Sequence, residues 1–184
     1  MAPLVIPTFT GEYFWLSNFY ARPLRFRVAG QGPDAFGLDF PMSEHAYQAG
    51  KAHAMVDKSR NARADFILSI RAEPDPTRCK HIARKAQIDV ALWDSMKDGV
   101  MREVVFEKFL QHADLRDKLL DTGTAMLVEG NTWGDTYWGR VDGKGLNHLG
   151  VILMETRGYF HFVDRNESLR ANWLKPPLAT LPLG

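Results

Sequence analysis

The longest helical pattern in the chain, over residues 88–112, is the feature that most limits its fold. Apolar side chains recur there at the spacing of one helix face, and that face is wide enough to suit the centre of a core. Its members are Leu92, Trp93, Met96, Val100, Met101, Val104, Val105, Phe109 and Leu110. We therefore predict a central helix, with Trp93 either in the core or in one wall of a pocket.

Shorter helical patterns accompany this one. Apolar residues at helical offsets predict a helix over 59–70. Thr77, Asp114 and Asn147 each precede a further helical segment and are predicted to cap it, because their side chains can accept hydrogen bonds from the first free amides of a helix. Helices are therefore expected to dominate the second half of the chain.

Two short segments, 24–28 and 36–40, have the pattern of strands and are joined by a glycine- and proline-containing turn at 29–34. They predict an antiparallel hairpin. With 184 residues, the chain is expected to be a single compact α+β domain, predominantly helical, with a small antiparallel sheet. Residues 1–8 are predicted to be an irregular arm, and residues 161–184 a C-terminal extension.

Composition excludes several classes of site. The formal net charge of +1 disfavours a nucleic-acid-binding domain, although it leaves a single modified base open as a substrate. Cys79 is the only cysteine, so a disulfide and a cysteine zinc cluster are excluded, and we interpret it as an incidental thiol. The histidines lack metal-ligand spacing, and no metal or cofactor is expected. Without a long apolar run, we expect a cytoplasmic protein that does not enter membranes.

A polar helix face begins after Ser43, which is predicted to be its N-terminal cap. Glu44, Tyr47, Gln48 and Lys51 follow at offsets that put them in one row. One interpretation is a solvated face. The other is a row that points inward, which is expensive for polar groups unless they form a site.

A second informative stretch begins at Glu129 and combines polar, aromatic and glycine residues. Besides Glu129 it contains Asn131, Trp133, Asp135 and Trp138. Tryptophans offer flat faces on which a base or sugar can stack, and glycines let the backbone approach a ligand closely. We favour a binding site over an aromatic structural corner, because a corner would not need the neighbouring polar groups.

Further candidate contacts lie outside these two stretches. Ser17 and Asn18 form either a turn or a rigid loop whose Asn18 contacts a ligand. Arg140 and Lys144 are candidates for phosphate binding, Lys144 because it stands between glycines. A basic group after residue 77 is interpreted as a solvated face in preference to a phosphate site; its members are Arg78, Lys80, His81, Arg84 and Lys85.

Several of these motifs occur in a specific order. They are Leu16-Ser17-Asn18-Phe19, Ser43-Glu44-His45-Ala46-Tyr47-Gln48 with Lys51-Ala52, Glu129-Gly130-Asn131-Thr132-Trp133-Gly134-Asp135 with Trp138-Gly139, and Gly143-Lys144-Gly145-Leu146-Asn147 with Leu149-Gly150. Together they resemble the NADAR/YbiA family over about residues 9–160, which would form the catalytic domain.

The resemblance implies a compact, mostly helical YbiA-like domain and an N-glycosidase that cleaves the bond between ribose C1 and a nitrogen. The expected substrate is guanine in DNA or RNA that carries ADP-ribose. One alternative is a phosphorylated ribosylamino-pyrimidine, an early intermediate of riboflavin synthesis. Another is a non-catalytic module that binds ADP-ribose, which the pair of Glu44 and Lys51 disfavours because binding alone does not need it.

Breaking such a bond builds positive charge on C1 and negative charge on the leaving nitrogen. The expected catalytic residues are Glu44, Lys51 and Asp135. Lys51 could hold a phosphate as a cation or attack C1 as a neutral amine, and the resemblance favours the second role, through a Schiff base. The expected substrate-binding residues are Ser17, Asn18, Tyr47, Gln48, Trp93, Asn131, Trp133, Trp138, Arg140 and Lys144.

Overall fold

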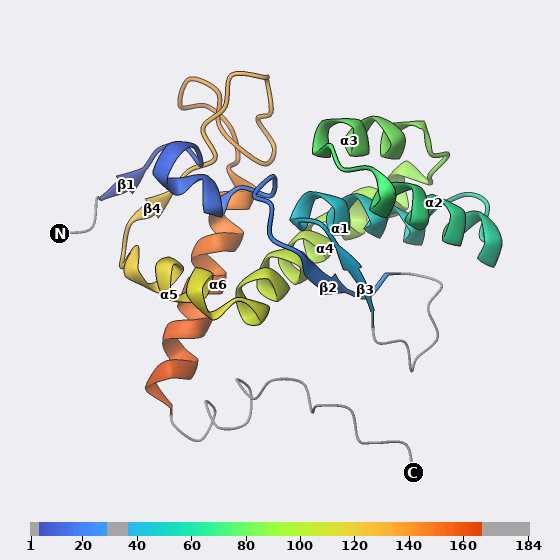
Figure 1. The fold of residues 1–184 in the computed structure, drawn as a ribbon. Helices are drawn as coiled ribbons and strands as arrows, with labels where there is room; N and C mark the ends of the chain where they lie inside the picture. The colour runs from blue at the N-terminus through green and yellow to red at the C-terminus, as the bar shows by residue number, and fades with distance from the viewer. Residues whose placement is uncertain (1–3, 29–36, 167–184) are drawn as a thin grey trace, which may run out of the picture.

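Helix α4 (Val90–Gln111) passes through the middle of the molecule (Figure 1) and packs against α1 (Ser43–Ala49), α5 (Ala113–Asp121) and α6 (His148–Arg165). The computed structural model describes residues 4–28 and 37–166. Val104, Val105 and Phe109 of α4 are almost completely buried, and Asp89 caps the helix by accepting from the amide of Leu92. The predicted central helix is confirmed.

Helix α1 packs against α4 and continues as a 3-10 helix, Gly50–Ala54, which also contacts α4. Every residue of α1 is buried. A Cβ atom on Gly50 would lie 2.6 Å from Cγ1 of Val100 on α4, a separation at which atoms clash. The small residues on this segment therefore bring its backbone close to α4, and a larger side chain at Gly50 would force the two apart.

The next helices are α2 (Arg60–Ala72) and α3 (Pro76–Lys85), both beside α1. The prediction that Thr77 caps α3 was wrong. Asp75 is the cap, and its carboxylate accepts from the amides of Thr77 and Arg78. Pro76 fits the first position of α3. A backbone amide at that position has no carbonyl partner within the helix, so proline, which lacks the amide hydrogen, loses no hydrogen bond there.

The predicted cap of α5 was also wrong. His112 occupies the cap position without a side-chain hydrogen bond to the helix. Asp114 lies in the first turn, where its negative charge interacts favourably with the positive end of the helix dipole. Its carboxylate accepts instead from Arg22, at 2.7 Å, which ties α5 to the segment before the hairpin.

Strands β2 (Leu24–Phe26) and β3 (Leu38–Phe40) pair antiparallel, with Leu24 opposite Phe40, so the predicted hairpin is confirmed. Its predicted turn at 29–34 lies outside the described residues, as does the C-terminal extension from residue 167. The helix α6 continues to Arg165, past the boundary predicted at residue 160.

Part of the predicted irregular arm forms a strand. β1 (Val5–Ile6) pairs in parallel with β4 (Met126–Leu127), which comes much later in the sequence. Next to β4, Asn147 precedes α6 with φ of 57° but does not cap it with its side chain. Its amide group donates to the carbonyl of Leu127 and accepts from the amide of Glu129, which joins the start of α6 to the loop that follows β4.

Within residues 4–28 and 37–166, no helix has the length and apolar character needed to cross a membrane. The same residues contain no group of three or more His, Cys, Asp or Glu side chains arranged to hold a metal ion.

Asn147→Ala should lower the free energy of unfolding by about 1–3 kcal/mol, because the Leu127 carbonyl and the Glu129 amide lose their partner. Urea unfolding measures the change. Asn166→Ala removes an exposed amide bond to the Phe162 carbonyl and is the control, with an expected change within about 0.5 kcal/mol. Equal effects in the two variants would contradict the role of Asn147.

Candidate active site

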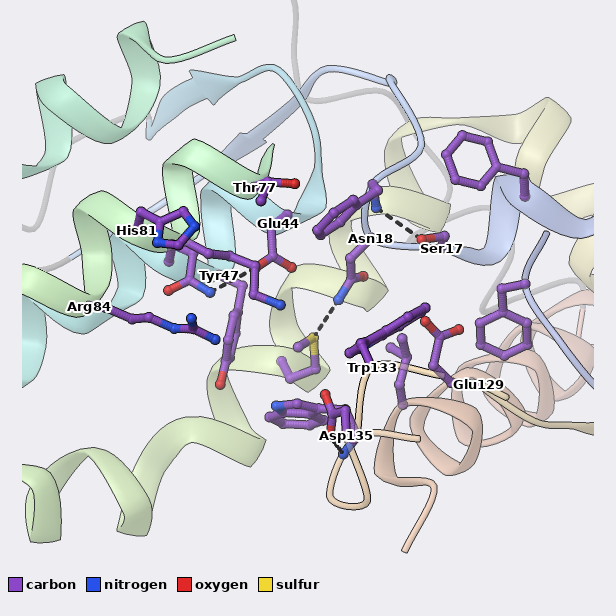
Figure 2. Close-up of a pocket in the computed structure, with 18 of the residues that line it drawn as sticks. Ser17, Asn18, Glu44, Tyr47, Thr77, His81, Arg84, Glu129, Trp133 and Asp135 are labelled. Carbon is purple, nitrogen blue, oxygen red and sulfur yellow. Dashed lines mark hydrogen bonds between the residues drawn. The ribbon is translucent and has the colours of Figure 1, made fainter. Parts of the chain in front are cut away.

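A cavity of about 710 Å³ is lined by α1, α3, α4 and the loop that joins β4 to α6 (Figure 2). All three residues predicted to be catalytic line it, namely Glu44, Lys51 and Asp135. So do the predicted binding residues Ser17, Asn18, Tyr47, Gln48, Trp93, Trp133 and Trp138. The cavity therefore brings together residues that are far apart in the sequence.

Glu44 projects from α1 into this cavity and is only 6% exposed, so the solvated-face interpretation is wrong. Its Oε1 accepts from Nε2 of Gln48 at 2.7 Å, and its backbone amide donates to the carbonyl of Asn18. Burial raises the pKa of Glu44, opposed by the positive charge of Lys80. A carboxyl group that keeps its proton in this way can donate it to a leaving group.

Ser43 is not the cap of this helix, in contrast to the prediction. Met42 holds the cap position, and Ser43 is the first residue of α1, with its Oγ buried and without a hydrogen-bond partner. The error moves the start of the helix by one position and leaves the row from Glu44 to Lys51 unchanged.

Lys51 follows α1 on the 3-10 helix, where its Nζ lies 5.9 Å from the centre of the Trp93 ring. Burial lowers the pKa of Lys51, Glu44 opposes this shift, and the positive charges of Arg84 and Lys80 add to it. A lower pKa increases the share of neutral amine, which is the nucleophilic form.

Three aromatic rings form one wall of the cavity. Tyr47 contacts Trp93 at 5.4 Å and Trp138 at 5.5 Å between ring centroids. Burial raises the pKa of Tyr47, so its phenol stays neutral. Trp133 also lines the cavity but is 65% exposed, which makes its indole a free surface for stacking at the rim.

Asn131 shapes the loop and does not line the cavity. Its Nδ2 donates to the carbonyl of Asp135, and its Oδ1 accepts from the amide of Asp135. Oδ1 of Asp135 in turn accepts from the amides of Tyr137 and Trp138. These bonds hold Asp135 and Trp138 at the cavity, and the binding role of Asn131 stays a prediction.

The two residues predicted to bind phosphate, Arg140 and Lys144, also lie outside the cavity lining. The backbone of Arg140 pairs with Glu129 and Asn131, and Lys144 closes a tight turn with Val141. Lys144 was chosen because it stands between glycines, but the glycines of this region serve the folding of the loop. A Cβ atom on Gly145, for example, would lie 2.4 Å from the carbonyl oxygen of Gly139.

Helix α3 supplies the cations instead. Lys80, His81 and Arg84 line the cavity together with Thr77. The interpretation of the basic group as a solvated face holds in part, because His81 and Arg84 are exposed and Lys80 is half-buried. Figure 2 shows His81 and Arg84 on the side of the cavity where Glu44 and Tyr47 lie. A signal was present in the sequence, because Thr77, Lys80, His81 and Arg84 have the spacing of one helix face.

Cys79 lies on the opposite face of α3 and is fully buried. Burial raises the pKa of its thiol to about 12, so the thiolate required of a nucleophile does not form near neutral pH. This agrees with the interpretation of Cys79 as an incidental thiol.

Two further charged residues belong to this region. The sequence analysis placed Glu129 in a stretch favoured as a binding site but gave it no role of its own, and it did not single out Lys108. Glu129 lines the cavity, and burial together with Asp135 raises its pKa to about 7. Lys108 is 1% exposed behind the cavity wall, where Nζ donates to the Ser17 carbonyl at 2.9 Å and burial lowers its pKa to about 7. The sequence did hold an indication that Lys108 is buried, because it lies beside Val105 and Phe109 on the apolar face of α4.

Comparison with known proteins identifies the family. Residues 8–161 match the model of the NADAR domain. N-glycosidase YbiA of Shigella flexneri is 37% identical over 149 residues, which cover 79% of this chain and 81% of that protein. The chloroplastic riboflavin biosynthesis protein PYRR of Zea mays is 33% identical over 135 residues, covering 69% of this chain and 21% of that protein.

A solved structure supports the same relation at the level of the fold. The NMR structure of Escherichia coli YbiA superimposes with a TM-score of 0.71 and 33% sequence identity, over 90% of both chains. The mostly helical α+β fold with small sheets is therefore shared. The chain belongs to the NADAR domain family and, within it, to the YbiA-like N-glycosidases.

Proposed function

We propose that this chain hydrolyses the bond between C1 of a phosphorylated ribose and the exocyclic nitrogen of an aminopyrimidine ring. The observation that carries this proposal is the pairing of a buried carboxyl group, Glu44, with a cationic wall in one cavity. Among the described residues, no carboxylate forms an ion pair with Lys80 or Arg84 of α3. Unpaired cations beside a cavity attract an anion, and a ribose phosphate supplies one.

Glu44 and Lys51 have complementary roles in the proposed reaction. When the sugar ring is open, C1 forms an imine with the ring amine, and the neutral amine of Lys51 adds to that carbon. The leaving amine takes a proton from the carboxyl group of Glu44, and C1 stays bonded to Lys51 as a Schiff base. Water then adds to C1, which releases the ribose aldehyde and restores the amine of Lys51.

The choice of an aminopyrimidine rests on the relative from Zea mays, whose name assigns it to riboflavin biosynthesis. It reverses the order that the sequence analysis favoured. ADP-ribosylated guanine is the second candidate, because Trp133 is 65% exposed at the rim and offers a stacking surface for a further base. A pure binding module is disfavoured, since binding alone does not require a buried Glu44 beside Lys51.

Glu44→Gln keeps the shape of the side chain and removes its proton donor. We expect kcat to fall by about 100- to 10,000-fold with the ribosylamino-pyrimidine phosphate, because general acid catalysis is lost. Glu103→Gln, on the exposed side of α4, is the matched control and should keep full activity. Activity that survives unchanged in Glu44→Gln would contradict the proposed role.

Arg84→Gln should raise KM by about 10- to 100-fold for the phosphorylated substrate, with kcat nearly unchanged, because a hydrogen bond to a charged group is lost. With the same substrate lacking its phosphate, the variant and the parent should have the same KM. Arg78→Gln changes an exposed residue of the same helix and is the control. An equal loss with both substrates would argue against phosphate binding by α3.

Borohydride added during turnover should reduce the Schiff base and leave the ribose phosphate attached to Lys51, which peptide mass spectrometry would locate. Because burial lowers the pKa of Lys51, the adduct should form at a lower pH than with an ordinary surface lysine. Lys51→Met should give no adduct. Active parent enzyme without an adduct on Lys51 would rule out the covalent route.

A further inference from the structure

Lys108 places an amine on the face of α4 that forms the core. Its neighbours on that face, Val105 and Phe109, are apolar and almost completely buried. Among the described residues, its Nζ forms one hydrogen bond, to the Ser17 carbonyl at 2.9 Å, and no ion pair. A buried amine loses its hydration, so an apolar side chain of similar length would suit this position better. Core packing therefore does not explain why position 108 carries an amine.

The Ser17 carbonyl does not depend on Lys108 for a partner. The backbone amide of Tyr20 also donates to it, at 3.2 Å, within the turn that follows the 3-10 helix Gly11–Leu16. Removal of the amine would thus leave no buried acceptor without a donor. The contribution of the amine is a link between two elements, because its hydrogen bond joins segment 17–18 to α4.

Segment 17–18 in turn holds the first turn of α1. The Asn18 carbonyl accepts from the backbone amide of Glu44 at 3.0 Å, while the cap residue, Met42, provides no side-chain hydrogen bond. The backbone of Asn18 thus satisfies a helix amide that a capping side chain would satisfy elsewhere. The side chains of Asn18 and Glu44 both line the cavity (Figure 2), so the position of this segment affects both.

Helix α4 holds segment 17–18 at two points. Met101, which lies two turns before Lys108, accepts from Nδ2 of Asn18 at 3.2 Å through its sulfur. Sulfur is a weak acceptor, whereas a carbonyl that accepts from an amine forms a stronger bond, and a stronger one still when the amine is charged. Lys108 is therefore the stronger of the two attachments.

We infer that Lys108 is a positioning residue of the active site, which sets Glu44 and Asn18 in the cavity by fixing segment 17–18 against α4. This inference rests on the proposed function, because it takes Glu44 as the proton donor. Lys108 does not line the cavity, and its effect passes through the Ser17 carbonyl and the bond between Glu44 and Asn18. Misplacement of a catalytic group by about 1 Å can lower a rate about 100-fold.

The test replaces the amine by an apolar side chain of similar length. Lys108→Met should melt at the parent's temperature or above it, because methionine suits the apolar surroundings. Its kcat should nevertheless fall by about 10- to 100-fold with the ribosylamino-pyrimidine phosphate. KM should stay within about threefold, because the contacts of α3 with the phosphate are unchanged. Lys118→Met, at an exposed position of α5, is the matched control and should change neither value.

Amide hydrogen exchange, followed by NMR, measures the same effect without a substrate. In Lys108→Met, the protection of the Glu44 amide should fall about 10-fold or more, while the amide of Val104 in α4 keeps its protection. Lys108→Gln is the second variant, used if Lys108→Met does not fold. Its side chain is one bond shorter and should not reach the Ser17 carbonyl, so the same loss of protection is expected.

The outcomes separate this inference from the proposed function. Unchanged protection of the Glu44 amide would overturn the inference whatever the enzyme hydrolyses, and so would an unchanged kcat. A lower melting temperature, with protection lost equally at Glu44 and Val104, would also overturn it, because Lys108 would then serve stability alone. Loss confined to the Glu44 amide, with a parent that hydrolyses neither candidate substrate, would sustain the positioning role and overturn the proposed function.

Discussion

The close packing of α1 and its 3-10 extension against α4 is the contact on which the rest of the structure depends. Gly50 has no room for a Cβ atom against Val100, and Ala46 and Ala49 are fully buried. This approach buries every side chain of α1, including Glu44 and its neighbours. A polar row that would be solvated on an ordinary surface helix is thereby turned into one wall of a cavity.

Burial of polar groups opposes folding unless other interactions compensate, and here the compensation is incomplete. Gln48 supports Glu44, and Lys108 supports the Ser17 carbonyl, but oxygens of Asn18 and Glu129 remain without partners. The same burial moves the pKa values of carboxyl groups upward and of lysines downward, toward each other. A ligand that donates hydrogen bonds to these unpartnered oxygens would gain the interaction energy that the protein alone does not use.

The sequence predicted what local spacing determines. The row from Glu44 to Lys51 and the central helix follow from helical periodicity, and both are present. Spacing placed Lys80 and Arg84 on one helix face but could not predict that α3 turns this face toward that row, because tertiary packing decides which element a helix face meets. The glycines beside Lys144 suggested a phosphate site, but they are required by the backbone of the turn itself. Pairing of β1 with β4 joins distant segments and has no local signal.

The central claim is that one cavity holds the phosphate of a ribose at α3 and its C1 beside Glu44. A crystal structure with ribose 5-phosphate bound tests it most directly. The account predicts the phosphate against Lys80 and Arg84, with C1 facing Glu44 and Lys51. Phosphate bound at the turn that carries Lys144, or C1 directed away from Glu44, would contradict it.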